Sequence, residues 1–121
     1  WSGSPSTGIF SIDFLTERIG VVVGGNYTED QNNSNNILLT FNGGLSWEKP
    51  EIPVFGYRSC VKYINAQTLI STGTSGTDIS KDAGKTWQNI SKESFNVIAL
   101  SDNKKIIYLA GSQGNIVSLQ L

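Results

Sequence analysis

The residues of this sequence best suited to bind a charged ligand are the neighbours Tyr57 and Arg58 and, further along the chain, Asp78. An arginine guanidinium offers a planar fork of donors that matches a carboxylate or a phosphate. The same group could instead pair with a carboxylate of the protein, such as Asp13 or Asp78, and hold two segments together. The sequence favours this structural pairing, and ligand contact by Tyr57, Arg58 and Asp78 stays open as the alternative.

Catalytic chemistry has few candidates, because the chain has no histidine, one cysteine (Cys60) and only two arginines, Arg18 and Arg58. The missing histidine excludes Ser-His-Asp and Cys-His mechanisms and removes the commonest zinc ligand. The segment GTSG at 73–76 is one residue short of a nucleophile elbow, so we interpret it as a loop. We therefore assign no catalytic residue to this chain.

A metal site is suggested only by the alternating residues Asp30, Asn32, Ser34 and Asn36. A calcium loop needs glycine at its sixth position and a bidentate glutamate at its twelfth, and this chain has asparagine and phenylalanine there. We interpret the segment as a solvated insertion, and we predict no metal and no cofactor.

The composition limits the classes of partner. A hydrophobic fraction of 38% is enough to bury a core, while a net charge of −1 lacks the basic surface of nucleic-acid-binding proteins. No apolar run is long enough to cross a membrane as a helix, so we predict no membrane insertion. The lone thiol of Cys60 lies in an apolar stretch and is predicted to be a small core residue.

Two segments of the chain repeat each other and establish its organisation. Residues 40–47 (TFNGGLSW) and 80–87 (SKDAGKTW) share the pattern Ser/Thr-x-Asp/Asn-x-Gly-x-Ser/Thr-Trp. Asp or Asn can accept hydrogen bonds from its own turn, Gly can take a left-handed conformation, and Trp can begin the next strand. The predicted structural residues of these turns are Thr40, Asn42, Gly44, Trp47, Ser80, Asp82, Gly84 and Trp87.

The repeat extends to the strands around these turns. Ser11, Ser59 and Val97 occupy one register position in three units, and Gly25, Gly73 and Gly111 occupy a second. An insertion of polar residues, 27–36, accounts for the longer first unit. Third strands are predicted at 37–40, 77–80 and 115–118, and fourth strands at Trp47 and Trp87.

Short strands in four-stranded units of this length indicate an all-β protein built like a β-propeller. We predict a fragment of about three four-stranded antiparallel blades, of which the last has three strands. The blades are expected at 8–54, with the turn 40–47; at 55–92, with the turn 80–87; and at 93–121, the incomplete C-terminal blade. Residues 1–7 are interpreted as an orphan fourth strand.

On the two turns and the strand register, the chain resembles Asp-box (BNR-repeat) β-propellers. These include sialidases, sortilin-type propellers and Ycf48-like photosystem II assembly factors, and the resemblance extends to the last blades of bacterial propellers of unknown function. The resemblance implies that the Asp boxes are structural and that the protein is extracytoplasmic, secreted or periplasmic. In a propeller, Tyr57 and Arg58 would open the innermost strand of a blade, beside the central channel.

We therefore predict a non-enzymatic scaffold or binding module, with a protein or glycan ligand at the channel mouth. One alternative is a sialidase-like glycoside hydrolase whose active site needs further blades, since two arginines cannot supply a sialidase arginine cluster. The other is a protein-assembly factor of the Ycf48-like type. The open ends of three blades would expose apolar surface, which favours self-association.

Overall fold

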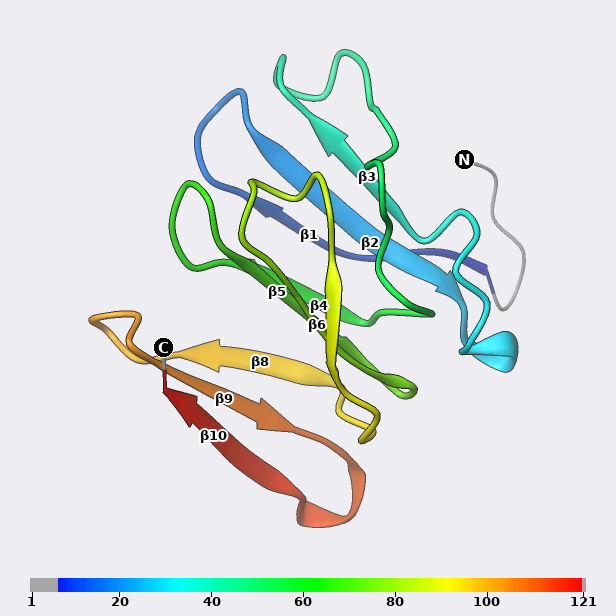
Figure 1. Ribbon diagram of the computed structural model, residues 1–121, viewed down its shortest axis with the longest axis vertical. Helices are drawn as coiled ribbons and strands as arrows, with labels where there is room; N and C mark the ends of the chain where they lie inside the picture. Colours follow the sequence, from blue (N-terminus) through cyan, green and yellow to red (C-terminus); the bar gives the residue numbers. More distant parts are fainter. Residues whose placement is uncertain (1–6, 121) are drawn as a thin grey trace.

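A computed structural model describes residues 7–120 of the chain and contains three antiparallel sheets there (Figure 1). The all-β prediction is confirmed, since the two helical elements, η1 (Tyr27–Glu29) and η2 (Ser112–Gly114), are single 3-10 turns. The strands are β1 (Thr7–Phe14), β2 (Gly20–Asn26), β3 (Ile37–Thr40), β4 (Cys60–Tyr63), β5 (Leu69–Gly73), β6 (Gly76–Ser80), β7 (Gln88–Ser91), β8 (Val97–Leu100), β9 (Ile106–Ala110) and β10 (Ile116–Gln120).

In each sheet the strands follow one another in chain order, and each is antiparallel to the next. The first has the order β1-β2-β3, the second β4-β5-β6-β7 and the third β10-β9-β8. Their central strands are rich in β-branched residues, and Gly or Asn clusters end them, which is why short strands form here. The predicted third strands of all three units and the fourth strand after Trp87 are therefore present.

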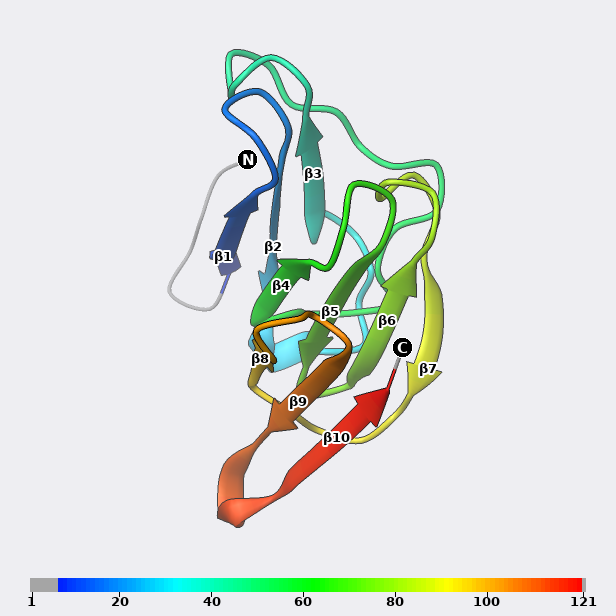
Figure 2. The ribbon, with the colours of Figure 1, turned by 90° about the vertical axis from the view of Figure 1, so that its left-hand side faces the viewer.

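The three sheets lie side by side with their first strands next to one another (Figure 2). The free edge of β4 is covered by side chains of β1, because Ser11 accepts from the Val61 N–H at 3.2 Å and Asp13 from the Tyr63 N–H at 2.8 Å. One apolar core lies between the first and second sheets and contains Trp87. A second lies between the second and third sheets and contains Phe95.

The fourth strand predicted at Trp47 is wrong. Within the described residues, the first sheet has three strands, and the segment after Trp47 makes only one bridge to it, between Leu39 and Glu48. Pro50 and Pro53 follow, and proline has no N–H to continue a ladder. The segment instead runs beside the second repeat, where the Ile52 N–H donates to the Lys85 carbonyl at 3.2 Å.

The predicted register is wrong by one residue in the first unit. Gly24, and not Gly25, is the counterpart of Gly73, because a β-carbon on Gly24 or on Gly73 would collide with a carbonyl oxygen of the preceding segment. These carbonyls belong to Gly8 and Tyr57, respectively. A slip of one residue moves every side chain to the other face of a strand, so the structural counterpart of Ser11 is Cys60 and not Ser59.

Three further expectations have different outcomes. The Cys60 side chain is half-buried at the edge of the second core, so it is not the fully enclosed residue that the sequence suggested. The orphan strand at 1–7 falls almost wholly outside the described residues, and Thr7 begins β1. Among residues 7–120, the structure contains no helix long and apolar enough to cross a membrane.

Candidate functional site

A hollow of about 550 Å³, here called the loop hollow, opens between the first and second sheets. It lies beyond the ends of β2 and β5, whereas the turns 40–47 and 80–87 follow β3 and β6 at the opposite end. Its lining combines one exposed aromatic ring with charged and hydroxyl side chains. The lining residues are Asp30, Gln31, Phe55, Thr74, Ser75 and Lys92.

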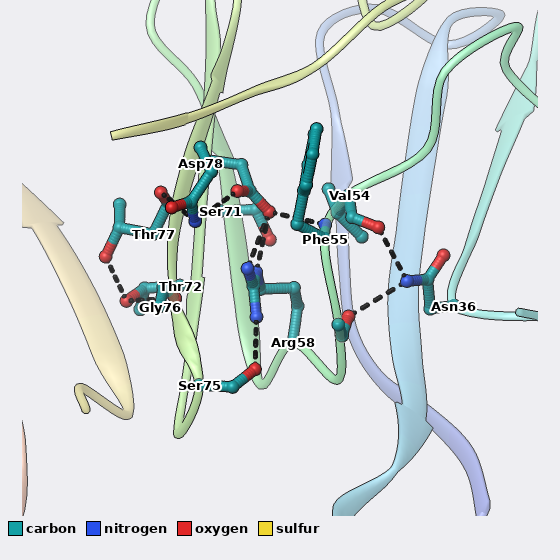
Figure 3. Close-up of polar contacts among 12 residues, drawn as sticks. Asn36, Val54, Phe55, Arg58, Ser71, Thr72, Ser75, Gly76, Thr77 and Asp78 are labelled. Carbon is teal, nitrogen blue, oxygen red and sulfur yellow. Dashed lines mark hydrogen bonds and ion pairs between the residues drawn. The ribbon is translucent and has the colours of Figure 1, made fainter. Parts of the chain in front are cut away.

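Beneath the loop hollow lies a buried ion pair between Arg58 and Asp78, both fully inaccessible to solvent (Figure 3). Arg58 Nε donates to Asp78 Oδ2 at 2.8 Å, and Nη2 lies at the same distance but poorly aligned for a hydrogen bond. Arg58 Nη1 donates to the Tyr57 carbonyl at 2.8 Å and to Ser75 Oγ at 3.0 Å. Asp78 Oδ2 also accepts from the Phe55 N–H at 2.9 Å.

The pair thus connects the segment that carries Phe55 to the loop that carries Ser75, two sides of the loop hollow. Removing one partner of a buried pair leaves an uncompensated charge, at a cost of roughly 3–5 kcal/mol. Asn89 Nδ2 adds a bond to Asp78 Oδ1 at 2.9 Å. The arrangement is therefore rigid and fits the structural pairing that the sequence favoured.

The insertion at 27–36 is part of this scaffold and not merely solvated. Asp30 accepts at its carbonyl from the Tyr57 N–H and the Ser75 hydroxyl, and its Oδ2 accepts from Thr74 Oγ1 at 2.7 Å. Asn36 is buried and donates to the carbonyls of Val54 and Gly56 at 2.8 and 2.9 Å (Figure 3). The longer loop therefore holds the approach to β4 in place.

Tyr57 lies in an aromatic cluster beside the loop hollow. Its ring meets that of Phe10 edge-on, with centroids 5.0 Å apart, and Tyr27 lies 6.3 Å from Tyr57. Burial, and secondarily the charge of Tyr27, raises the pKa of the Tyr57 hydroxyl. The hydroxyl is therefore neutral at physiological pH.

The structure brings Tyr57, Arg58 and Asp78 together, but it buries all three, so none of them lines the loop hollow. The lining residues that sequence reasoning did not single out are Gln31, Phe55 and Lys92. The sequence did single out Asp30 and the loop 73–76, although for a calcium loop and a nucleophile elbow. Only the fold shows that these two segments meet.

The turns 40–47 and 80–87, here the Asn42 turn and the Asp82 turn, form nearly the same hydrogen bonds. Asn42 Oδ1 and Asp82 Oδ1 each accept from the backbone N–H four residues later at 2.9 Å. Gly44 and Gly84 have φ values of +89° and +92°, the left-handed conformation expected of them. These bonds hold the two turns in place.

The Asp82 carboxyl has a pKa below its ordinary value. Burial works in the opposite direction, but hydrogen bonds from the Thr86 side chain and backbone and from Ser80 outweigh it. The Thr86 hydroxyl donates to Oδ2 at 2.5 Å. The negative charge of Asp82 thus stabilises this turn.

Comparison with known proteins supports the fold. No family model and no curated protein matches the sequence. Among solved structures, an ancestral GH74 enzyme superposes with a TM-score of 0.68 at 21% identity, over 85% of this chain and 16% of that one. A structure described as YCF48 bound to D1 peptide superposes with a TM-score of 0.51 at 17% identity, over 96% of this chain and 53% of that one.

At these identities the comparisons establish the fold alone. Both neighbours are β-propellers, and the three antiparallel sheets lie side by side as propeller blades do. The chain is therefore a β-propeller fragment, as its repeats predicted. It spans a small part of the enzyme and about half of the peptide-bound protein.

Proposed function

We propose that this chain is a non-enzymatic binding module that takes an extended peptide segment of a protein partner in the loop hollow. The observation that carries the proposal is the hollow itself, whose lining combines the exposed ring of Phe55 with the charged residues Asp30 and Lys92. The ring of Phe55 gives a ligand one apolar contact, and the polar groups around it can fix the ligand's orientation.

The chemistry of the loop hollow suits a peptide. Phe55 is 41% exposed and offers an apolar contact, while Lys92 and Asp30 can attract the opposite charges of a peptide's side chains or ends. The hydroxyls of Thr74 and Ser75 are bound to Asp30 and therefore hold the wall of the hollow in place. The buried Arg58–Asp78 pair fixes the loops before binding, which reduces the entropy lost on association.

In this proposal Tyr57, Arg58 and Asp78 act as positioning residues behind the binding surface. The peptide bound to the YCF48 neighbour supports a protein ligand over a glycan and a role of the assembly-factor type. We also propose that the Asn42 and Asp82 turns are Asp boxes and that the protein is extracytoplasmic, as in the families it resembles.

The glycoside hydrolase alternative draws support from the GH74 neighbour. Glycoside hydrolysis usually needs two carboxylic groups facing the substrate. In this chain the Asp78 carboxylate is buried in an ion pair, and the Asp13 carboxylate accepts from the Tyr63 N–H. Both carboxylates therefore have structural partners. We expect no hydrolysis of nitrophenyl glycosides or sialosides, and turnover that Asp30→Asn abolishes in a folded protein would contradict our proposal.

The proposal is tested by selecting ligands for the immobilised chain from a random peptide library and, in parallel, on a glycan array. We expect peptide binding that Phe55→Ala and Lys92→Glu each weaken at least tenfold. Leu45→Ala is the matched control, because Leu45 is an exposed apolar residue in the Asn42 turn, at the opposite end of the sheets. Glycan binding alone, or peptide binding that neither variant changes, would overturn the proposal.

A further inference from the structure

The Asn42 turn contains the only Asn-Gly pair of the sequence, Asn42–Gly43. In such a pair the backbone nitrogen of glycine can attack the side-chain amide carbon of the asparagine before it, because glycine has no β-carbon to obstruct the approach. The Asp82 turn has Asp82 and Ala83 at the same two positions. Only the first of the two turns therefore combines the residues that favour spontaneous deamidation.

The reaction consumes one water molecule and releases one ammonia molecule. The Gly43 nitrogen loses its proton and bonds to Cγ of Asn42, the Cγ–Nδ2 bond breaks, and the side-chain nitrogen leaves as ammonia. Water then opens the five-membered succinimide ring. Opening at Cγ leaves an aspartate with a normal backbone, and opening at the main-chain carbonyl leaves an isoaspartate, whose backbone runs through the former side chain.

The folded turn holds both reacting groups away from this reaction. The Gly43 N–H donates to the Arg18 carbonyl at 2.9 Å, and a hydrogen-bonded amide loses its proton only when the bond opens. The Asn42 amide is held by Ser46 as well. Its Oδ1 accepts from the Ser46 N–H at 2.9 Å, and its Nδ2 donates to the Ser46 hydroxyl at 2.7 Å.

We propose that Asn42 is a deamidation site gated by the opening of its own turn. Asn42 and Gly43 are both exposed, so access of water does not limit the reaction. The limiting step is the simultaneous release of the Gly43 N–H from Arg18 and of the amide from Ser46. The fraction of molecules with an open turn therefore sets the rate of the reaction.

The two products affect the turn in opposite directions. Aspartate at position 42 places an oxygen where Nδ2 stands, so the Ser46 hydroxyl can donate to it as the Thr86 hydroxyl donates to Asp82. The first turn then has the charged hydrogen bond of the second. Isoaspartate instead adds a methylene group to the backbone and moves the carboxylate away from the Ser46 N–H. Deamidation therefore either converts the Asn42 turn into the type of the Asp82 turn or breaks it.

The test is incubation of the 121-residue chain at mildly alkaline pH, folded in buffer and unfolded in concentrated urea. Peptide mapping by mass spectrometry locates each amide that has become an acid. We expect Asn42 to react faster than every other asparagine in the unfolded chain. We expect its reaction to be at least about tenfold slower in the folded chain, because the turn must open first.

Three variants separate the chemistry from the gate. Gly43→Ala should suppress the reaction in both states while keeping the turn, because Ala83 takes a φ of +66° at the same position of the Asp82 turn. Ser46→Ala removes the partner of Nδ2 and should speed the reaction of the folded chain. Thr86→Ala is the matched control, because it removes the equivalent hydroxyl from the other turn and should leave the rate at Asn42 unchanged.

Circular dichroism verifies that each variant folds, and the wild-type comparison holds even if Ser46→Ala does not. Equal rates at Asn42 in the folded and unfolded wild type would show that the turn is no gate. A faster reaction at another asparagine of the unfolded chain would show that Asn42 is not the favoured site. A folded Thr86→Ala variant that reacts as fast as a folded Ser46→Ala variant would place the gate in global unfolding and overturn the assignment to this turn.

Discussion

The first and second repeats share the turn pattern, yet their tryptophans have different surroundings. Trp87 lies in the core between two sheets and donates its Nε1–H to the Gly84 carbonyl at 3.0 Å. Trp47 is half-buried on the face of the first sheet that points away from the second sheet, where its ring meets that of Phe14 edge-on with centroids 6.4 Å apart. The same motif therefore stabilises the fold by different amounts in the two repeats, because its position among the sheets decides how much apolar surface it buries.

The largest expected difference is between the two tryptophans. Trp87→Ala should destabilise the fold by roughly 3–5 kcal/mol, since it empties a large site in a packed core. Trp47→Ala should cost less than about half of that, because its ring remains partly in solvent. Denaturant unfolding at a fixed protein concentration measures both values, and equal losses would contradict the comparison.

The next difference is between the turn residues Asp82 and Asn42. Asp82→Ala should cost about 1–2 kcal/mol, the scale of the lost turn hydrogen bonds, and Asn42→Ala should cost less. The reason is that Asp82 accepts a charge-assisted bond from the Thr86 hydroxyl, whereas the neutral Asn42 amide donates to the Ser46 hydroxyl at 2.7 Å. Chemical denaturation of both variants tests this order, and the explanation fails if Asn42 is the more sensitive position.

The two turns should also differ in their dependence on pH. The pKa of Asp82 is lower in the folded protein than its ordinary value of 3.8. Its contribution is therefore fully present above pH 3.8 and is lost as the pH falls through the lower, folded value. Asp82→Asn should remove this dependence, so the stability gap between wild type and variant should narrow in acid. A gap that is constant from pH 7 to about pH 2 would refute the assignment.

The smallest expected effect comes from Tyr63, the counterpart of Phe14 in the corrected register. Its hydroxyl is buried without a hydrogen-bond partner among the described residues, and burial, with a smaller effect of Asp13, raises its pKa to about 12. Tyr63→Phe should change the stability by less than about 0.5 kcal/mol, because no hydrogen bond is lost. A loss above about 1 kcal/mol would show that the hydroxyl has a partner in solution.

Local patterns were sufficient to predict most of the strands. The alternation of apolar runs with Gly and Asn clusters predicted the strands at 37–40 and after Trp87, and the repeated turn pattern predicted the propeller fold. A fourth strand at Trp47 was predicted from the repeated turn pattern. This prediction was wrong, because Pro50 and Pro53 prevent the ladder from continuing. The predicted alignment of Gly25 with Gly73 was wrong because Gly24 and Gly25 are adjacent in the sequence, and the close approach of the Gly8 carbonyl to Gly24 distinguishes them in the structure.

The sequence by itself determined the local features: short strands, two hydrogen-bonded turns and a repeat. These depend on residues close together in the chain, whose conformational preferences can be read directly. The tertiary structure alone decided that Asp30, Phe55 and Lys92 line one hollow, that Arg58 pairs with Asp78 and not Asp13, and that Trp87 is buried while Trp47 is not. The physical reason is that burial and ion pairing depend on which sheets meet, and those contacts join residues far apart in sequence.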